Sequence, residues 1–170
     1  AKAGRISAEG HVAAMKICKP GMMEYQLEAV YVHHFMNQGC RLQAYPSIVG
    51  GGANACILHY TNNDKELLDG DLVLVDAGAE YQLYAGDITR TFPVNGKYSA
   101  PQRALYDLVL AAQLAAIAEV KPGNHWNEPH EAAVRVLTAG LLELGILKGE
   151  LETLLEEQAY KPFYMHKTGH

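Results

Sequence analysis

Hydrophobic residues recur at helical spacing in four long stretches of the chain, grouped as two pairs. The first pair covers residues 4–18 and 23–38, and the second covers residues 100–120 and 127–144. The apolar positions follow one another at intervals of three and four residues, which is typical of an amphipathic helix. The second stretch shows this spacing most fully, at Leu27, Val30, Tyr31, His34 and Phe35.

A Lys-Pro-Gly tripeptide separates the helices of each pair, at residues 19–21 and again at 121–123. Pro and Gly punctuate helices, so the tripeptide marks the end of one helix before the next begins. The repetition predicts two structurally similar halves, the second of them cut short at residue 170. A chance match of three residues is the alternative.

Strand-like patterns lie between the two helix pairs. Residues 70–78 (GDLVLVDAG) form a near-continuous apolar run, as expected where both faces of a sheet are covered, and residues 84–94 (YAGDITRTFPV) alternate. Pairing of residues 72–78 with 85–92 would make an antiparallel hairpin, although the intervening turn lacks the Asn-Gly or Asp-Gly of a tight hairpin. The predicted fold class is α/β (α+β) with an antiparallel sheet. The last residues, from 162 onward, are expected to be a strand entering a loop.

Two aspartates, Asp76 and Asp87, lie in this hairpin, where the midpoint of the turn makes them direct cross-strand partners. Like charges placed directly opposite each other are destabilising. Either one carboxylate keeps its proton or a cation lies between them. The alternative is that one aspartate caps a turn while the other pairs with Arg90. Carboxylate ligands suit Mg or Mn, and added imidazole moves the preference toward Mn, Fe, Co or Zn. His166 and His170 supply imidazoles four residues apart.

Composition and charge narrow the classes of function. The net charge is −5 and no run of Lys and Arg occurs, so we expect no nucleic-acid partner. No apolar run approaches the roughly 18 residues that cross a bilayer, so we expect no membrane association. Three cysteines without a Cys-x-x-Cys motif suggest reduced thiols and a cytoplasmic protein. The chain ends within a Gly/His-rich segment, which predicts that it is part of a longer protein.

Three segments together resemble a known family: VDAGAEYQLYAGDITRTFPVNGKYS, ACILHYTNND and PFYMHKTGH. They are similar to the Xaa-Pro aminopeptidases (aminopeptidase P) of the metallopeptidase superfamily that also contains prolidase and methionine aminopeptidase. The resemblance runs from about residue 20 to the last residue. It implies a truncated pita-bread (creatinase/methionine aminopeptidase-like) fold with two helix-pair half-repeats. Residues 1–170 would then be part of a catalytic metallopeptidase domain, without its N-terminal domain and the C-terminal part of the catalytic domain.

The same resemblance implies a site with two divalent metal ions, usually Mn²⁺, with Co or Zn possible. The metal ligands would be Asp76, Asp87 and His170, completed by two glutamates that this sequence does not contain. His59 and His166 would be catalytic residues that face the substrate, with the ring of Tyr45 as a substrate-binding wall. Thr89 and Arg90 would orient Asp87. The other histidines are expected in the core (His34) or on the surface (His33, His125 and His130).

The activity that the resemblance implies is release of the N-terminal residue from peptides with proline in second position. A hydroxide bridging the two metals would attack the carbonyl that precedes proline. The full-length protein would be a homo-oligomer, and the 170-residue chain alone would be inactive and bind divalent metal weakly. Two alternatives remain open: a prolidase restricted to Xaa-Pro dipeptides, and a non-catalytic pita-bread module that binds peptide or protein.

Overall fold

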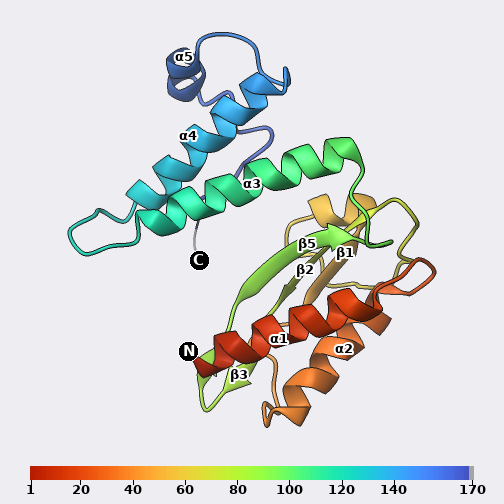
Figure 1. Ribbon diagram of the computed structural model, residues 1–170. Coiled ribbons are helices and arrows are strands. Elements are labelled where there is room, and N and C mark those ends of the chain that lie inside the picture. The colour runs from red at the N-terminus through yellow and green to blue at the C-terminus, as the bar shows by residue number, and fades with distance from the viewer. Residues whose placement is uncertain (169–170) are drawn as a thin grey trace. The chain divides into compact units, whose positions relative to one another are not determined.

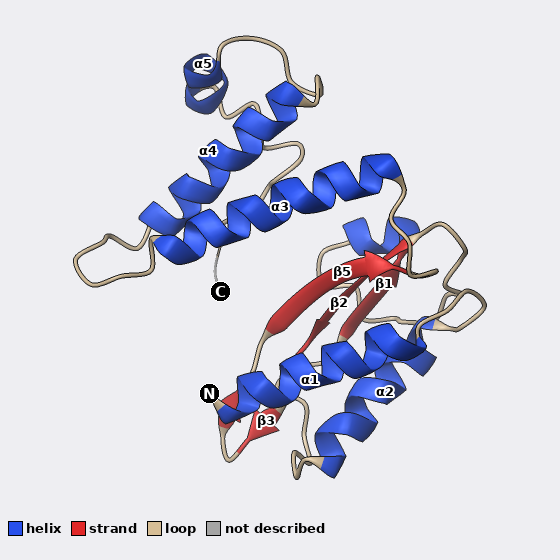
Figure 2. Ribbon diagram, in the orientation of Figure 1, coloured by secondary structure: helices blue, strands red, loops and turns tan. Residues whose placement is uncertain are grey.

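The computed structural model describes residues 1–168. The chain divides into two compact units, Ala1–Ser99 and Ala100–His170. Both units are shown in Figure 1, and their helices and strands are distinguished by colour in Figure 2. Among the described residues, no helix is both long and apolar enough to cross a membrane.

The first unit packs two helices on one face of a three-stranded sheet (Figure 1). The helices are α1 (Lys2–Ile17) and α2 (Glu24–Asn37). The strands are antiparallel in the order β1-β2-β5, and a short 3-10 helix, η1, follows β1. Their bounds are Ile48–Gly51 for β1, Gly52–Cys56 for η1, Leu72–Ala77 for β2 and Ile88–Pro93 for β5.

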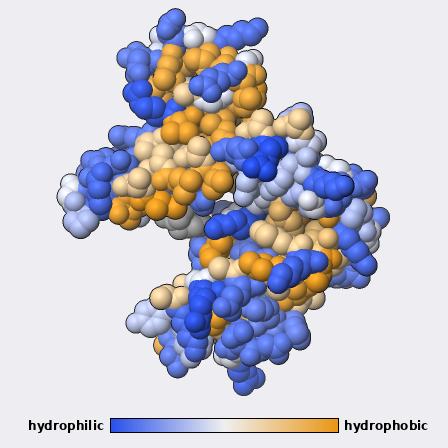
Figure 3. All heavy atoms as spheres, in the orientation of Figure 1, coloured by the Kyte–Doolittle hydropathy of each residue, from blue (hydrophilic) through white to orange (hydrophobic). Residues whose placement is uncertain are grey.

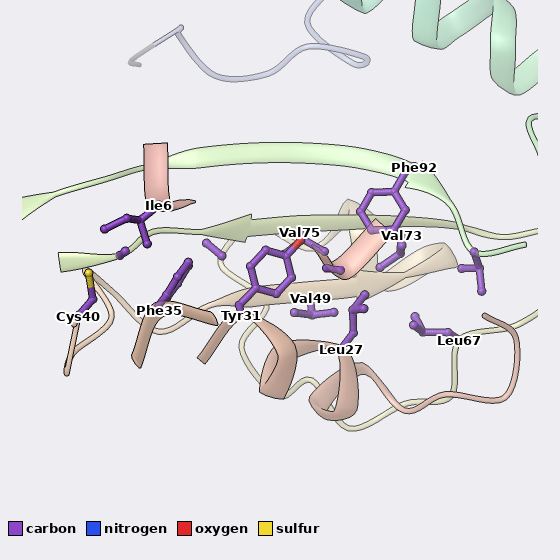
Figure 4. Close-up of a cluster of buried hydrophobic side chains, with 14 residues drawn as sticks. Ile6, Leu27, Tyr31, Phe35, Cys40, Val49, Leu67, Val73, Val75 and Phe92 are labelled. Atoms are coloured by element: carbon purple, nitrogen blue, oxygen red, sulfur yellow. The ribbon is translucent and has the colours of Figure 1, made fainter. Parts of the chain in front are cut away.

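Alternation along β2 separates the core from the opposite face of the sheet. Val73, Val75 and Ala77 are completely buried, whereas the intervening Leu72, Leu74 and Asp76 are half-buried. The buried set faces side chains of the two helices, and each large apolar side chain contributes about 1.5–3 kcal/mol by leaving water. Figure 4 shows this cluster, which includes Ile6, Leu27, Tyr31, Phe35 and Val49.

The strands β2 and β5 belong to one long hairpin with a constant register. Asp76 pairs with Thr89, and the same register continues through β3 (Glu80–Tyr81) and β4 (Tyr84–Ala85). The two residues at the tip, Gln82 and Leu83, have φ values of 50° and 69°. Positive φ at both central residues is what a type I′ turn requires, so the turn is tight without Asn-Gly. The predicted pairing of Asp76 with Asp87 is therefore wrong by two residues.

The second unit is helical. It contains α3 (Ala100–Ala118), α4 (Glu128–Glu143) and α5 (Leu151–Glu156). Small residues let α3 and α4 approach closely: a side chain at Gly140 would overlap Leu108. Figure 3 shows apolar side chains gathered over this unit. Those that are exposed on α3 include Val109, Leu114 and Ile117.

The predicted helices are confirmed in both pairs, with shifts of a few residues at their ends. Both Lys-Pro-Gly tripeptides follow a helix, and their glycines, Gly21 and Gly123, have φ values of 87° and 94°. Glycine is favoured in this left-handed conformation because it has no Cβ. The predicted strand at the end of the chain is wrong for the described residues, since residues 162–168 form turns and irregular structure.

Candidate metal centre

Asp76 and Asp87 lie on the same face of the hairpin, opposite the face that packs on α1 and α2. Thr89 is the direct partner of Asp76. Asp87 lies two residues before Thr89, and side chains two residues apart in a strand share a face. The two aspartates are thus diagonal neighbours, an arrangement that still allows their side chains to meet.

Tyr45 joins the two carboxylates. Its hydroxyl lies 2.5 Å from Oδ1 of Asp76 and 2.8 Å from Oδ1 of Asp87. A phenol carries one proton, so the hydroxyl can donate to only one of these oxygens at a time. The other contact needs a proton on the carboxyl group or a cation beside it. Burial, followed by the hydrogen bonds to the two aspartates, raises the pKa of Tyr45 far above its ordinary value.

A bulge in the neighbouring chain segment brings Tyr45 to this position. Gln43 pairs with Ala79 and Ile48 pairs with Asp76, so residues 44–47 lie opposite only residues 77–78. The hydroxyl of Ser47 donates to Oε1 of Gln43 across the bulge, at 2.6 Å. Bulges of this kind re-aim side chains next to functional sites. The bulge therefore explains why Tyr45 leaves the strand edge and reaches the two aspartates.

Two glycines make room for the tyrosine and for the loop that carries Asp87. A Cβ at Gly78 would overlap the carbonyl oxygen of Gly86 and would lie 3.0 Å from Cε1 of Tyr45. A Cβ at Gly86 would meet the hydroxyl of Ser7. These positions are filled by neighbouring backbone and side chains, so glycine is needed for close packing around the aspartates.

A buried histidine holds the backbone beside Asp87 from the helix side. Nε2 of His11 lies 2.8 Å from the carbonyl oxygen of Ile88, and Nδ1 lies 3.0 Å from the hydroxyl of Tyr31. A carbonyl only accepts, so Nε2 donates to Ile88 and Nδ1 accepts from Tyr31. Burial lowers the pKa of His11. Sequence reasoning missed His11; its spacing with Ser7 and Ala14 on one helix face is the signal that could have found it.

The two residues expected to orient Asp87 lie on opposite faces of β5. Thr89 shares the face of the aspartates, opposite Asp76. Arg90 pairs with Val75 and so belongs to the face of the helices, where its Nη1 donates to the carbonyl oxygen of Thr89 at 2.7 Å. Within the hairpin, Thr89 is therefore better placed than Arg90 to contact the aspartates directly.

His59 lies in the turn after η1. Its side chain is exposed and its φ is 56°, an uncommon value for a residue other than glycine. Within residues 1–168, no hydrogen bond or ion pair joins His59 to Asp76 or Asp87. The structure therefore presents His59 to solvent on a conformationally constrained turn.

The segment that contains His166 is anchored in the second unit. The ring centroid of His166 is 5.5 Å from that of Tyr164. The backbone N–H of Thr168 donates to Nδ1 of His130 at 3.2 Å, and burial lowers the pKa of that histidine. His130 is half-buried and is not the surface residue that the sequence suggested. His170, the third predicted metal ligand, lies outside the described residues.

The aspartate pair fits part of a site for hard divalent cations. Its oxygens accept hydrogen bonds, lie close together and share a single tyrosine proton, so a cation would relieve their mutual repulsion. In the part of the chain that the structure describes, no group of three or more His, Cys, Asp or Glu residues could hold a metal ion. The described residues therefore bring together two carboxylates that could bind such a cation, and further ligands would have to come from outside residues 1–168.

Comparison with known proteins gives a consistent result. An Xaa-Pro aminopeptidase from Haemophilus influenzae is 55% identical over 169 residues, which cover 99% of this chain and 39% of that protein. The structure of aminopeptidase PepP from Pseudomonas aeruginosa matches with a TM-score of 0.97 and 54% identity, over 99% of this chain and 38% of that one. A zinc-substituted Escherichia coli aminopeptidase P in complex with product matches with a TM-score of 0.95 and 50% identity, over 98% of this chain and 38% of that one.

The chain thus spans about two fifths of the length of the relatives it matches. Its fold is part of the pita-bread fold of aminopeptidase P, as the resemblance implied. The match to metallopeptidase family M24 covers residues 1–170, and membership of that family implies divalent metal cofactors. The chain belongs to metallopeptidase family M24.

Proposed function

We propose that the protein containing this chain is an Xaa-Pro aminopeptidase, which releases the N-terminal residue from peptides with proline in second position. The observation that carries the proposal is the placement of Asp76 and Asp87 on one face, with both carboxylates in contact with the hydroxyl of Tyr45. The names of the relatives support the reaction class, since the Haemophilus influenzae protein is called an Xaa-Pro aminopeptidase.

Asp76, Asp87 and His170 would hold two divalent cations, with Mn²⁺ proposed as the native metal and glutamates outside this chain completing the ligands. Divalent metals at such a site supply Lewis acidity and lower the pKa of bound water toward neutrality. Tyr45 restrains both carboxylates through its hydroxyl, and Thr89 lies beside Asp76 on the same face. These contacts fix the direction of the ligand oxygens, which is the role that groups around metal ligands usually have.

His59 and His166 would act on the substrate. An imidazole N–H can donate to the carbonyl oxygen that precedes proline and stabilise the charge that develops there. The exposure of both side chains is consistent with contact to a substrate. The ring of Tyr45 would form one wall of the substrate site. We further propose that the protein is a cytoplasmic homo-oligomer.

Activity measurements on the full-length protein test the proposal. With added Mn²⁺, a tripeptide with proline in second position should be cleaved after its first residue. Asp87→Asn keeps the size of the side chain and removes its charge, so it should lower both metal affinity and kcat by at least about 100-fold. Asp69→Asn removes a carboxylate in the turn before β2 and should leave both unchanged.

Three results would contradict the proposal or redirect it. Cleavage of Xaa-Pro dipeptides without cleavage of the tripeptide would favour a prolidase. Absence of bound metal and of cleavage would favour a non-catalytic module. Full activity of the Asp87→Asn variant would remove the aspartate pair from the mechanism.

A further inference from the structure

Glu24, the first residue of α2, carries a carboxylate that is completely buried. Burying a carboxylate is costly unless it is paired or fully hydrogen-bonded. Among residues 1–168, no Lys, Arg or His forms an ion pair with Glu24. The charge must therefore be compensated by hydrogen bonds.

Four donors surround the carboxylate, two on each oxygen. The backbone N–H of Gly51 and the amide of Asn54 donate to Oε1 at 2.9 and 3.0 Å. The hydroxyl of Tyr60 and the backbone N–H of Lys65 donate to Oε2 at 2.7 and 3.1 Å. All four donors come from residues 51–65, so one helix residue ties together both ends of this segment.

His59 lies between these attachment points. Gly51 and Asn54 precede it, while Tyr60 and Lys65 follow it. Its φ of 56° is strained for a residue with a side chain, and such strain persists only where the surroundings over-determine the backbone. The four hydrogen bonds to Glu24 fix the backbone on both sides of His59 in this way. The pKa of Tyr60 is raised to about 12 by burial and by Glu24, so its hydroxyl keeps the proton that it donates.

We propose that Glu24 is a positioning residue for His59: its buried carboxylate holds residues 51–65 so that His59 projects toward the substrate. This inference rests on the proposed function, in which His59 donates to the substrate carbonyl. A carboxylate is suited to the task because it only accepts: the two backbone N–H groups and the Asn54 amide nitrogen can only donate, and the hydroxyl of Tyr60 already accepts from Asn54 at 3.0 Å. Glutamine at this position would turn an NH₂ group toward donors, and the loop would loosen although the side chain keeps its size.

Kinetics on the full-length protein with Mn²⁺ and a tripeptide with proline in second position test the proposal. His59→Ala should lower kcat by about 100-fold, the usual effect of losing one donor to a developing oxyanion. Glu24→Gln should lower kcat by roughly 10-fold, because it misplaces the same donor. The double variant should be no slower than His59→Ala alone, since Glu24 acts through His59. Multiplied effects in the double variant would overturn the proposal.

A control separates positioning from general stability. Leu27→Ala removes a completely buried side chain from the next turn of α2 and touches none of the four hydrogen bonds. It should lower the melting temperature but leave kcat unchanged well below that temperature. If Glu24→Gln does not fold, Tyr60→Phe removes one donor and should show a smaller loss of kcat that again disappears in the His59→Ala background.

Hydrogen–deuterium exchange separates failure of this proposal from failure of the proposed function. Without substrate or added metal, amides in residues 55–65 should exchange roughly fivefold faster in Glu24→Gln, as expected for the loss of about one hydrogen bond. Amides in β5 should be unaffected. Faster exchange in Glu24→Gln, together with no Xaa-Pro cleavage by the wild-type protein, would contradict the proposed function but support the role of Glu24 in holding residues 51–65. Unchanged exchange in Glu24→Gln would overturn the role of Glu24.

Discussion

At the scale of single residues, the centre of the site is a tyrosine hydroxyl shared by two carboxylates. Tyr45 was expected only as an aromatic wall of the substrate site, and the structure shows that its hydroxyl contacts Asp76 and Asp87. The local sequence gives little indication of this contact, because the contact depends on a bulge whose extra residues are defined by pairing with residues 77–78. Pro46 is the one local sign, since proline cannot donate to a regular strand ladder.

Tyr45→Phe tests the shared hydroxyl. In metal-free protein the variant should lose about 1–3 kcal/mol of unfolding free energy, because hydrogen bonds to charged groups are removed. With saturating Mn²⁺ the loss should be smaller, because cations then compensate the two carboxylates. Urea denaturation with a chelator and with Mn²⁺ measures both values. Tyr84→Phe, at the exposed hairpin tip, serves as the control and should be neutral; equal losses for Tyr45→Phe in both conditions would contradict the prediction.

At the scale of elements, the site is made by one hairpin and the segment that bulges beside it. The packing is so close that a Cβ at Gly78 would overlap the Gly86 carbonyl and would lie 3.0 Å from the Tyr45 ring. This closeness holds the loop of Asp87 against Tyr45. A side chain at position 78 would therefore disturb the aspartates and the stability of the hairpin together.

A pair of Gly→Ala variants tests this. Gly78→Ala forces overlap with backbone, so it should destabilise the protein by at least about 1–3 kcal/mol. Gly4→Ala lies in α1 with no atom within 4 Å of the added Cβ, so it should stabilise by about 0.5–1 kcal/mol through helix propensity. Thermal unfolding of both variants gives the answer. A stable Gly78→Ala protein would show that the hairpin can open at this point.

The elements also show what a single sequence can and cannot predict. The helices were predicted because their apolar faces repeat over three or more turns, and a strand within residues 70–78 was predicted correctly, although one of its faces is only half-buried. The register was missed by two residues because Gln82 and Leu83 form the turn with positive φ, a conformation that residues with a Cβ seldom adopt. The shared face of the aspartates was still predicted, because an error of two residues preserves the side of the strand.

At the scale of the whole molecule, each unit has its own core, and the two cores differ. The first unit buries a cluster of fourteen residues that includes Tyr31 and Phe35, whereas the cluster in the second unit consists of Ala112, Ala116 and Ala133. The larger cluster also packs against His11, whose ring centroid lies 5.1 Å from that of Tyr31 and whose Nε2 donates to the carbonyl oxygen of Ile88, next to Asp87. The stability of the first unit should therefore depend on the protonation of that histidine.

Acid should destabilise the first unit through His11. Its folded-state pKa is lowered by burial and by Arg90, while Ile88 and Asp76 act in the opposite direction, so the folded state prefers the neutral ring. The stability that this preference provides is fully present above the ordinary value of 6.5 and is lost as the pH falls through the lowered pKa. Urea denaturation between pH 7.5 and pH 5 should show falling unfolding free energy.

Two histidine variants check the assignment. His11→Gln should be less stable at neutral pH but should show a weaker dependence on pH, because the titrating group is gone. His33→Gln changes an exposed histidine of α2 and should keep the full dependence. A wild-type slope in His11→Gln would assign the acid sensitivity to other groups.

The constant register of the long hairpin has a consequence for natural variation. Every pair from Leu72 with Pro93 to Tyr81 with Tyr84 obeys the same register. A shift of one residue in the pairing of the two strands would turn Asp87 to the reverse side of the ribbon and part it from Asp76. In descendants of this gene the identities of residues 80–85 can drift, but the pairing register of the two strands is under selection to stay the same.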